Sequence, residues 1–168
     1  MKIFLTGFMG CGKSTLGRKL ANKLSYSFVD LDKVIEQNAG MPIPRYFEAF
    51  GETAFRELEK NTLQTTAFPE DTVIATGGGL PCFHDNMQWM NEHGISAFIS
   101  LPPKVLADRL NTAQEERPVL QNLKGEALLE FITKKLAERE PFYRKANYIL
   151  NGIDLTAEKI IDYLRING

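Results

Sequence analysis

The stretch "GFMGCGKST", residues 7–15, follows the short apolar run "KIFLT" at 2–6. Gly7 to Ser14 match the Walker A pattern G-x-x-x-x-G-K-[ST], in which glycines let successive backbone N–H groups face one bound anion. The Lys13 ammonium and the N-terminus of a helix, which we expect to begin near Ser14, add positive charge at the same point. A strand before the loop and a helix after it are the context that this motif requires. The stretch therefore predicts a site for a nucleoside triphosphate. The residues expected to contact it here are Gly10, Cys11, Gly12, Lys13, Ser14 and Thr15.

The composition of the 168-residue chain limits its partners. Hydrophobic residues make up 43% and charged residues 24%, as in ordinary globular proteins, and the net charge of −1 argues against a broad surface for nucleic acid or anionic membranes. No apolar run approaches the roughly 20 residues that span a bilayer, and the first residues lack the layout of a signal peptide. We expect a single cytoplasmic domain over 1–168, with free thiols and no nucleic-acid or membrane partner.

Short β-type runs alternate with longer helical segments along the chain. We expect strands at 2–6, 27–30, 72–76, 96–101 and 148–150. We expect helices at about 14–24, 32–39, 45–66, 84–93, from about 103, at 126–144 and at 156–166, and a polar loop at 111–126. Strands separated by helices imply βαβ crossovers. The pattern therefore predicts an α/β protein, a three-layer α/β/α P-loop NTPase fold with a five-stranded parallel sheet.

Three chemically distinctive segments each follow a predicted strand directly. They are the phosphate loop, Asp30–Asp32 and Gly77–Gly79, and the carboxyl ends of parallel strands meet at one edge of the sheet. The strand "TVIAT" ends in a threonine and glycines, so Asp30 or Asp32 is the expected source of a carboxylate near a metal ion. Either aspartate is equally suited to cap a helix, and spacing alone does not decide between the two roles. The absence of an N-K-x-D motif argues against a GTPase.

Six segments occur in the order and spacing of one family. They are "GFMGCGKST" (7–15), "FVDLD" (28–32), "FGETAFRELE" (50–59), "VIATGGG" (73–79), "RPVL" (117–120) and "REPFYRKA" (139–146). From residue 2 to about 150 the chain resembles shikimate kinases, which are P-loop enzymes of the nucleoside monophosphate kinase type. The resemblance implies ATP-dependent phosphorylation of the 3-hydroxyl of shikimate in chorismate and aromatic amino-acid biosynthesis. It further implies Mg²⁺ as cofactor, a monomer, a substrate-binding subregion at about 31–62 and a lid at about 110–125.

The resemblance assigns three catalytic residues. Lys13 would lie between the β- and γ-phosphates, and Asp32 would orient the attacking hydroxyl and accept its proton. Arg117 corresponds to a lid arginine that closes onto the ATP phosphates. Phosphoryl transfer has a loose transition state, so positioning and charge neutralisation matter more than a strong base.

The resemblance also assigns the acceptor site. Arg56 and Arg139 correspond to arginines that bind the substrate carboxylate, a role that suits the bidentate guanidinium. Asp32 would bind substrate hydroxyls, and the Gly78 N–H would donate to the substrate. Taken without the resemblance, Arg56 is more typical of an exposed i,i+4 pair with Glu52, and Arg139 is typical of a solvated helix face.

The metal and adenine contacts complete the implied site. Ser14 would bind Mg²⁺ directly and Asp30 through a water molecule. The family often has an adenine-stacking arginine near position 110, but this chain has Leu110 there, preceded by Arg109. The residue that contacts adenine therefore stays open.

Two other classes of function compete with this interpretation. One is a related small-metabolite kinase that acts on gluconate or a nucleoside monophosphate, although a nucleobase acceptor does not require two arginines for one carboxylate. The other is a non-catalytic nucleotide-binding regulator, which we would expect to have lost the metal-side or acceptor-side residues that are present here.

Overall fold

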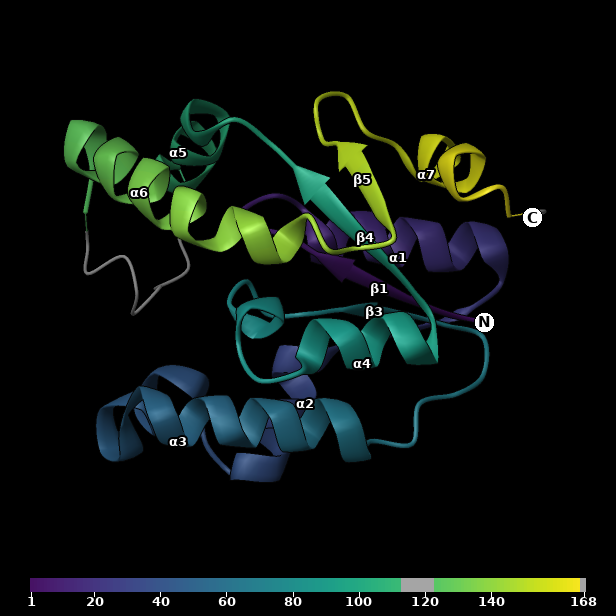
Figure 1. Ribbon diagram of the computed structural model, residues 1–168, viewed down its shortest axis with the longest axis horizontal. Coiled ribbons are helices and arrows are strands. Elements are labelled where there is room, and N and C mark those ends of the chain that lie inside the picture. Colours follow the sequence, from purple (N-terminus) through teal and green to yellow (C-terminus); the bar gives the residue numbers. More distant parts are fainter. Residues whose placement is uncertain (113–122, 167–168) are drawn as a thin grey trace.

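The computed structural model describes residues 1–112 and 123–166. Within these ranges, five strands form one sheet in the order β2-β3-β1-β4-β5, and every neighbouring pair is parallel (Figure 1). The strands are β1 (Lys2–Thr6), β2 (Ser27–Asp30), β3 (Thr72–Ala75), β4 (Ile95–Ser100) and β5 (Tyr148–Asn151). The α/β fold with a five-stranded parallel sheet is therefore confirmed.

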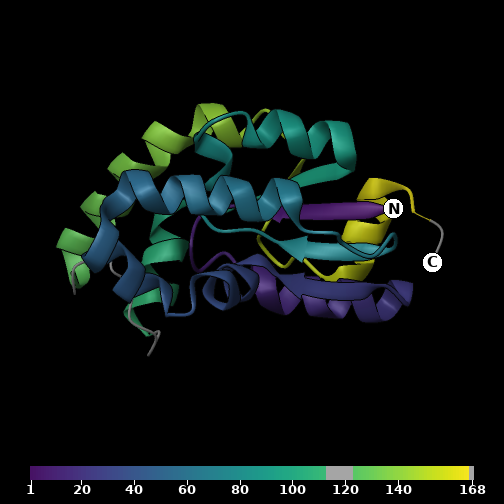
Figure 2. The ribbon, with the colours of Figure 1, turned by 90° about the horizontal axis from the view of Figure 1, so that it is seen from below.

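Helices cover both faces of the sheet (Figures 1 and 2). They are α1 (Lys13–Leu24), α2 (Leu31–Ala39), α3 (Ile43–Thr65), the short 3₁₀ helix η1 (Leu80–Cys82), α4 (Asn86–His93), α5 (Pro103–Asn111), α6 (Gly125–Tyr143) and α7 (Ala157–Leu164). Side chains alternate between the faces of a strand. Accordingly, Ile3 and Leu5 pack with residues of α1 and α7, whereas Phe4 packs with residues of α2, α3 and α4. Among the described helices, none has both the length and the apolar composition that a membrane crossing requires.

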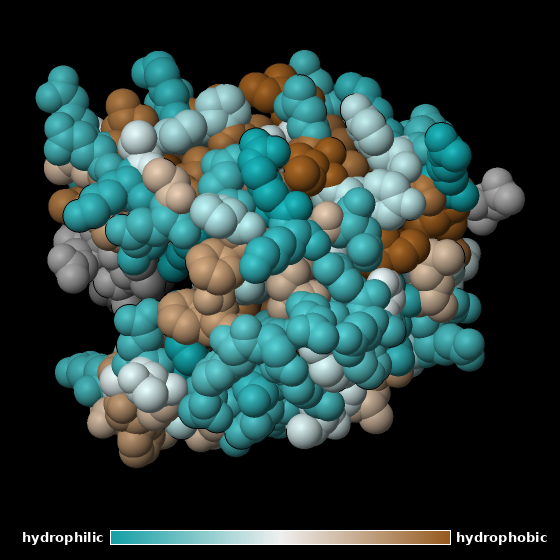
Figure 3. Space-filling model, viewed as in Figure 1, coloured by the Kyte–Doolittle hydropathy of each residue, from teal (hydrophilic) through white to brown (hydrophobic). Residues whose placement is uncertain are grey.

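Helix α3 departs from the uninterrupted helix expected over 45–66. Gly51 interrupts it with φ 83° and ψ 175°, a conformation that glycine reaches without steric cost. Apolar spacing continues on both sides of the break, so the sequence pattern did not indicate it. After the break, α3 buries Phe55 and Leu63 in the core, while the outer surface over this helix is mostly hydrophilic (Figure 3). The break and the buried face together set how the second half of α3 meets the sheet.

Helix α2 begins where β2 ends, at the edge of the sheet that carries the phosphate loop. The Asp30 carboxylate accepts a hydrogen bond of 3.1 Å from the Asp32 backbone N–H and so caps the helix. The helix ends at Gly40, which has φ 72°. Asp30 thus has the capping role that spacing allowed. The cap also holds Asp32 in the first turn of α2.

Candidate active site

The phosphate loop joins β1 to α1 and forms one wall of a cavity of about 340 Å³. Gly12 provides the N-cap of α1 with φ 99°, so the first N–H groups of the helix point toward the loop. The Lys13 ammonium donates to the carbonyl oxygens of Gly7 at 2.5 Å and Phe8 at 3.3 Å. These contacts hold the positive charge at the loop.

The same cavity unites the three segments that the sequence placed at one edge. It is lined by Met9, Gly10, Gly12, Lys13, Ser14, Thr15, Asp30, Asp32 and residues 75–78. Topology brings them together because each segment leaves the carboxyl end of a neighbouring strand: β1, β2 or β3. The cavity therefore combines cationic and N–H groups with two carboxylates.

A second, smaller cavity of about 120 Å³ adjoins the first. It is lined by Met9, Asp32, Ile43, Phe47, Phe55, Arg56, Glu59, Gly77, Gly78, Gly79 and Arg139. Both cavities are lined by Met9, Asp32, Gly77 and Gly78, so they form one cleft. The larger cavity, at the phosphate loop, is the more polar of the two. The smaller cavity is lined by two arginines and by aromatic side chains.

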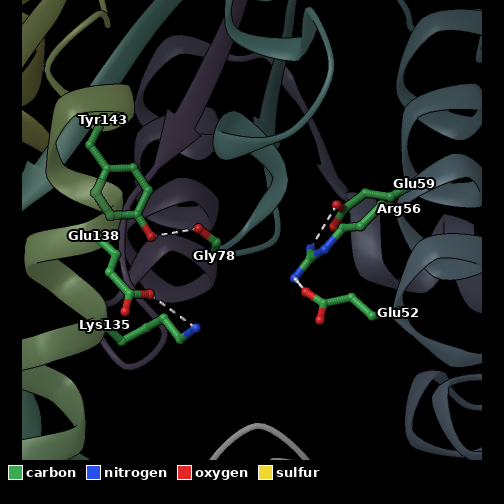
Figure 4. A network of polar contacts seen from close by, with 7 residues as sticks. All are labelled: Glu52, Arg56, Glu59, Gly78, Lys135, Glu138 and Tyr143. Carbon is green, nitrogen blue, oxygen red and sulfur yellow. Dashed lines mark hydrogen bonds and ion pairs between the residues drawn. The ribbon is translucent and has the colours of Figure 1, made fainter.

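Arg56 lies on α3 at the smaller cavity and is only 6% exposed. Its Nη1 donates to the Glu59 carboxylate at 2.9 Å, and its Nη2 lies 3.6 Å from Glu52 (Figure 4). The guanidinium lies over the Phe83 ring, with its Cζ 4.3 Å from the ring centroid. Its buried Nε has no hydrogen-bond partner within the described ranges. The i,i+4 pair of Arg56 with Glu52 therefore forms, but the expectation that the arginine in it is exposed is wrong, because its side chain is buried.

Arg139 approaches the same cavity from α6 and is 7% exposed. Its Cζ lies 5.4 Å from the centroid of the Phe8 ring. A Cβ atom at Gly78 would lie 3.4 Å from its Nη1, so the guanidinium rests against the backbone there. Its buried Nη1 likewise has no hydrogen-bond partner in the part of the chain that the structure describes. The alternative of a solvated helix face is wrong for Arg139 too.

Glu59 lies between Arg56 and Asp32 and is 1% exposed. Burial raises the pKa of its carboxyl to about 7, against the opposing effect of Arg56, and the Asp32 charge raises it further. A Cβ atom at Gly77 would lie 2.9 Å from Glu59 Oε2 and 3.1 Å from Asp32 Oδ1. Glycine at this position therefore lets both carboxylates reach the backbone after β3.

The start of the expected lid lies beside the phosphate loop, and which residue contacts adenine stays a prediction. Arg109 donates to the Cys11 carbonyl at 3.2 Å and to the Gly10 carbonyl at 3.4 Å, so it lies at the rim of the phosphate loop. Leu110 is buried, and its Cδ2 would lie 3.0 Å from a Cβ atom at Gly10. Leu110 therefore packs beneath the loop, away from solvent. Arg117 and the rest of 113–122 lie outside the described residues.

A sequence profile of one family matches residues 9–166, and that family is described as shikimate kinase. The chain belongs to the shikimate kinase family. The match covers both arginines, both aspartates and most of the phosphate loop. Members of the family are kinases, so the chain is an ATP-using shikimate kinase.

Relatives and solved structures agree with this membership. A shikimate kinase from Bacteroides fragilis is 51% identical over 149 residues, which cover 89% of this chain and 83% of the relative. The crystal structure of a shikimate kinase from Bacteroides thetaiotaomicron has a TM-score of 0.94 and 42% identity, covering 99% of each chain. A shikimate kinase from Acinetobacter baumannii in complex with shikimate has a TM-score of 0.87 and 34% identity, covering 98% of this chain and 92% of that chain.

Sequence reasoning missed three residues of this shikimate kinase site. Glu59 stands three positions after Arg56, and this i,i+3 spacing on one helix could have indicated the pair. Tyr143 stands four positions after Arg139 in "REPFYRKA", which also places the two on one helix face. Phe83 carries no comparable signal, because its contact with Arg56 depends on the path of the chain after η1.

Proposed function

We propose that the chain phosphorylates the 3-hydroxyl of shikimate in this cleft, with the carboxylate of the acceptor bound between Arg56 and Arg139. The observation that carries this assignment is the pair of buried N–H groups without partners among the described residues, Arg56 Nε and Arg139 Nη1, beside the phosphate loop. A buried donor without a partner costs roughly 1–3 kcal/mol, and more when it is charged. A carboxylate that accepts from both arginines would relieve this cost and fix the orientation of the acceptor.

The phosphate loop supports the donor side of the proposal. Residues Gly10 to Thr15 would surround the triphosphate, although the Cys11 N–H already donates to the Phe8 carbonyl at 3.1 Å within the loop. Lys13 would shift its ammonium from the loop carbonyls to the β- and γ-phosphates. The lysine then neutralises charge that develops on the transferring group. Arg117 would add a second cation from the lid, and this role stays a prediction because that residue lies outside the described ranges.

Asp32 lines both parts of the cleft, between the two ligands that we assign to it. We propose that its carboxylate accepts a hydrogen bond from the 3-hydroxyl and takes its proton as the oxygen bonds to the γ-phosphorus and the bond to ADP breaks. Its first role is orientation, because the loose transition state needs little basic assistance. The Gly78 N–H would hold another oxygen of the acceptor.

Side-chain oxygen atoms near the phosphate loop are suitable ligands for a magnesium ion. Ser14 and Asp30 both line the larger cavity, and hydroxyl and carboxylate oxygens are the ligands that Mg²⁺ favours. We propose direct binding by Ser14 and a water-mediated contact with Asp30. Held by these residues, Mg²⁺ would supply neutralisation of phosphate charge. The monomeric state stays a prediction of the resemblance, and the cytoplasmic location stays a prediction from the composition.

A coupled assay for ADP tests the proposed function. Purified protein is mixed with ATP and Mg²⁺, and ADP is followed with shikimate, gluconate, a nucleoside monophosphate or no acceptor. Among these mixtures, we expect rapid ADP formation only in the one that contains shikimate. We expect no ADP formation after EDTA is added. Equal or faster turnover of gluconate or of the nucleotide would overturn the choice of acceptor. Nucleotide binding without transfer to any acceptor would favour a regulator.

A further inference from the structure

The hydroxyl of Tyr143 donates a hydrogen bond to the carbonyl oxygen of Gly78 (Figure 4). Tyr143 ends α6, whereas Gly78 lies in the turn between β3 and η1. The tyrosine ring is 0% exposed and stacks on Phe98, with centroids 4.8 Å apart and an interplanar angle of 23°. The hydroxyl therefore contacts the carbonyl oxygen from a ring that is packed in the core.

Arg139 stands one helical turn before Tyr143, on the same face of α6. Its Nη1 would lie 3.4 Å from a Cβ atom at Gly78, so the arginine rests on the residue whose carbonyl Tyr143 holds. Burial raises the pKa of Tyr143 well above its ordinary value, although Arg139 opposes the shift. The phenol therefore stays protonated and remains a donor throughout the neutral pH range.

The next residue faces the other arginine. A Cβ atom at Gly79 would lie 2.6 Å from Arg56 Nη2 and 2.7 Å from Arg56 Nη1. The Gly78–Gly79 peptide thus lies between the two guanidinium groups, with Arg139 against one residue and Arg56 against the other. Both α6 and α3 contact η1, directly after this peptide. Both guanidinium groups therefore rest against this peptide.

We propose that Tyr143 is a positioning residue for the acceptor: its hydrogen bond fixes the Gly78–Gly79 peptide and thereby the spacing of the Arg56–Arg139 carboxylate clamp. This inference rests on the proposed function, because it assumes that Arg56 and Arg139 bind the carboxylate of the acceptor. The alternative is that Tyr143 only fills the core. The two roles differ in what the hydroxyl does, since the ring alone suffices for packing.

The variant Tyr143→Phe separates these roles, because it removes only the hydroxyl. It keeps the stacked ring, so we expect it to fold. We expect the KM for shikimate to rise about tenfold, the cost typical of losing one buried hydrogen bond, with the KM for ATP within about twofold and kcat within about threefold. Replacing Tyr143 with 4-aminophenylalanine restores a donor at the same place and should recover most of the affinity for shikimate. An unchanged KM for shikimate in Tyr143→Phe would overturn the proposal.

Thr72→Val is the matched control. Thr72 is a 0% exposed residue whose hydroxyl donates to the Pro69 carbonyl at 2.7 Å, at the end of β3 remote from the cleft. Like Tyr143→Phe, this substitution should lower the melting temperature by removing one hydrogen bond, but it should leave the KM for shikimate within about twofold. An equal rise of that KM in Thr72→Val would show that general destabilisation, and no positioning, explains the result.

A double-mutant cycle with Arg139→Lys tests whether Tyr143 acts through the clamp. In the Arg139→Lys background, the roughly tenfold effect of Tyr143→Phe should shrink to about twofold or less, because the geometry that the hydroxyl maintains is already lost. Independent, multiplicative effects would refute the proposal. A normal KM for shikimate in Arg139→Lys would also refute it, since Arg139 would then not bind the acceptor. Failure of the proposed function itself is recognised separately, because the unmodified protein would then not turn over shikimate.

Discussion

Arg56 and Glu59 form an ion pair at 2.9 Å in which both side chains are buried, one helical turn apart on α3. Arg56 also lines the smaller cavity, and its buried Nε has no hydrogen-bond partner among the described residues. Glu59 thus accepts from Nη1 of the guanidinium, while the Nε–H remains available to a ligand. A buried pair of this kind is sensitive to the loss of either partner, because the charge that remains is uncompensated.

Glu59→Gln should change how stability depends on pH. The Glu59 pKa is about 7 in the folded protein, compared with an ordinary value of 4.5 for a solvated glutamate, because burial disfavours the charged form. The folded state keeps the proton that the unfolded state loses, so this contribution to stability is complete below about pH 4.5 and is lost as the pH rises to about 7. As the pH rises through this window, the free energy of unfolding of the unmodified protein should fall by up to about 3 kcal/mol relative to that of Glu59→Gln. Urea unfolding of both proteins at intervals across this pH range measures it, and a constant difference would contradict the assignment.

Arg56→Lys should weaken acceptor binding. Lysine retains the charge but lacks the planar fork, so it cannot hold Glu59 and a carboxylate at the same time. We expect the KM for shikimate to rise at least about tenfold, with the KM for ATP unchanged. Arg144→Lys is the control, because that side chain is 55% exposed and pairs with Glu140 at the surface. A change in ATP affinity alone would show that Arg56 does not bind the acceptor.

Lys13→Met should act mainly on the chemical step. The substitution keeps the length of the side chain and removes the ammonium that the phosphate loop holds. We expect kcat to fall by about 10²- to 10³-fold, the usual loss when one group that stabilises developing charge is removed. Lys19→Met, at an exposed position of the same helix, should leave kcat nearly unchanged. Turnover of Lys13→Met close to that of the unmodified protein would exclude a catalytic role.

Phe83→Leu should loosen the guanidinium of Arg56 without removing any charge. The ring lies 4.3 Å from Arg56 Cζ, and a desolvated cation–π contact is worth about 1–2 kcal/mol. We expect the KM for shikimate to rise about fivefold. Phe142→Leu, at a 38% exposed ring that lies 5.6 Å from Lys145 Nζ, serves as the comparison and should have no effect. Steady-state kinetics at a fixed ATP concentration measure the KM for shikimate of both variants. Equal KM values would show that Phe83 does not support acceptor binding.

Much of the framework followed from local patterns. The P-loop spacing and the alternation of strands with helices predicted the sheet, and the sheet alone implied that the phosphate loop, Asp30–Asp32 and Gly77–Gly79 meet at one edge. These features depend on residue types at short separations, which the sequence displays directly. The break at Gly51 did not follow, since glycine is compatible with both a helix and its interruption.

The sequence by itself determined where a phosphate would bind, because nine consecutive residues contain the whole loop. It did not determine what Arg56 and Arg139 contact, because their burial depends on α3 and α6 approaching the same turn from opposite sides. Only the tertiary structure brought Glu59, Phe83 and Tyr143 to that turn. For both arginines, packing against distant segments removes the guanidinium from water and leaves one donor without a partner among the described residues.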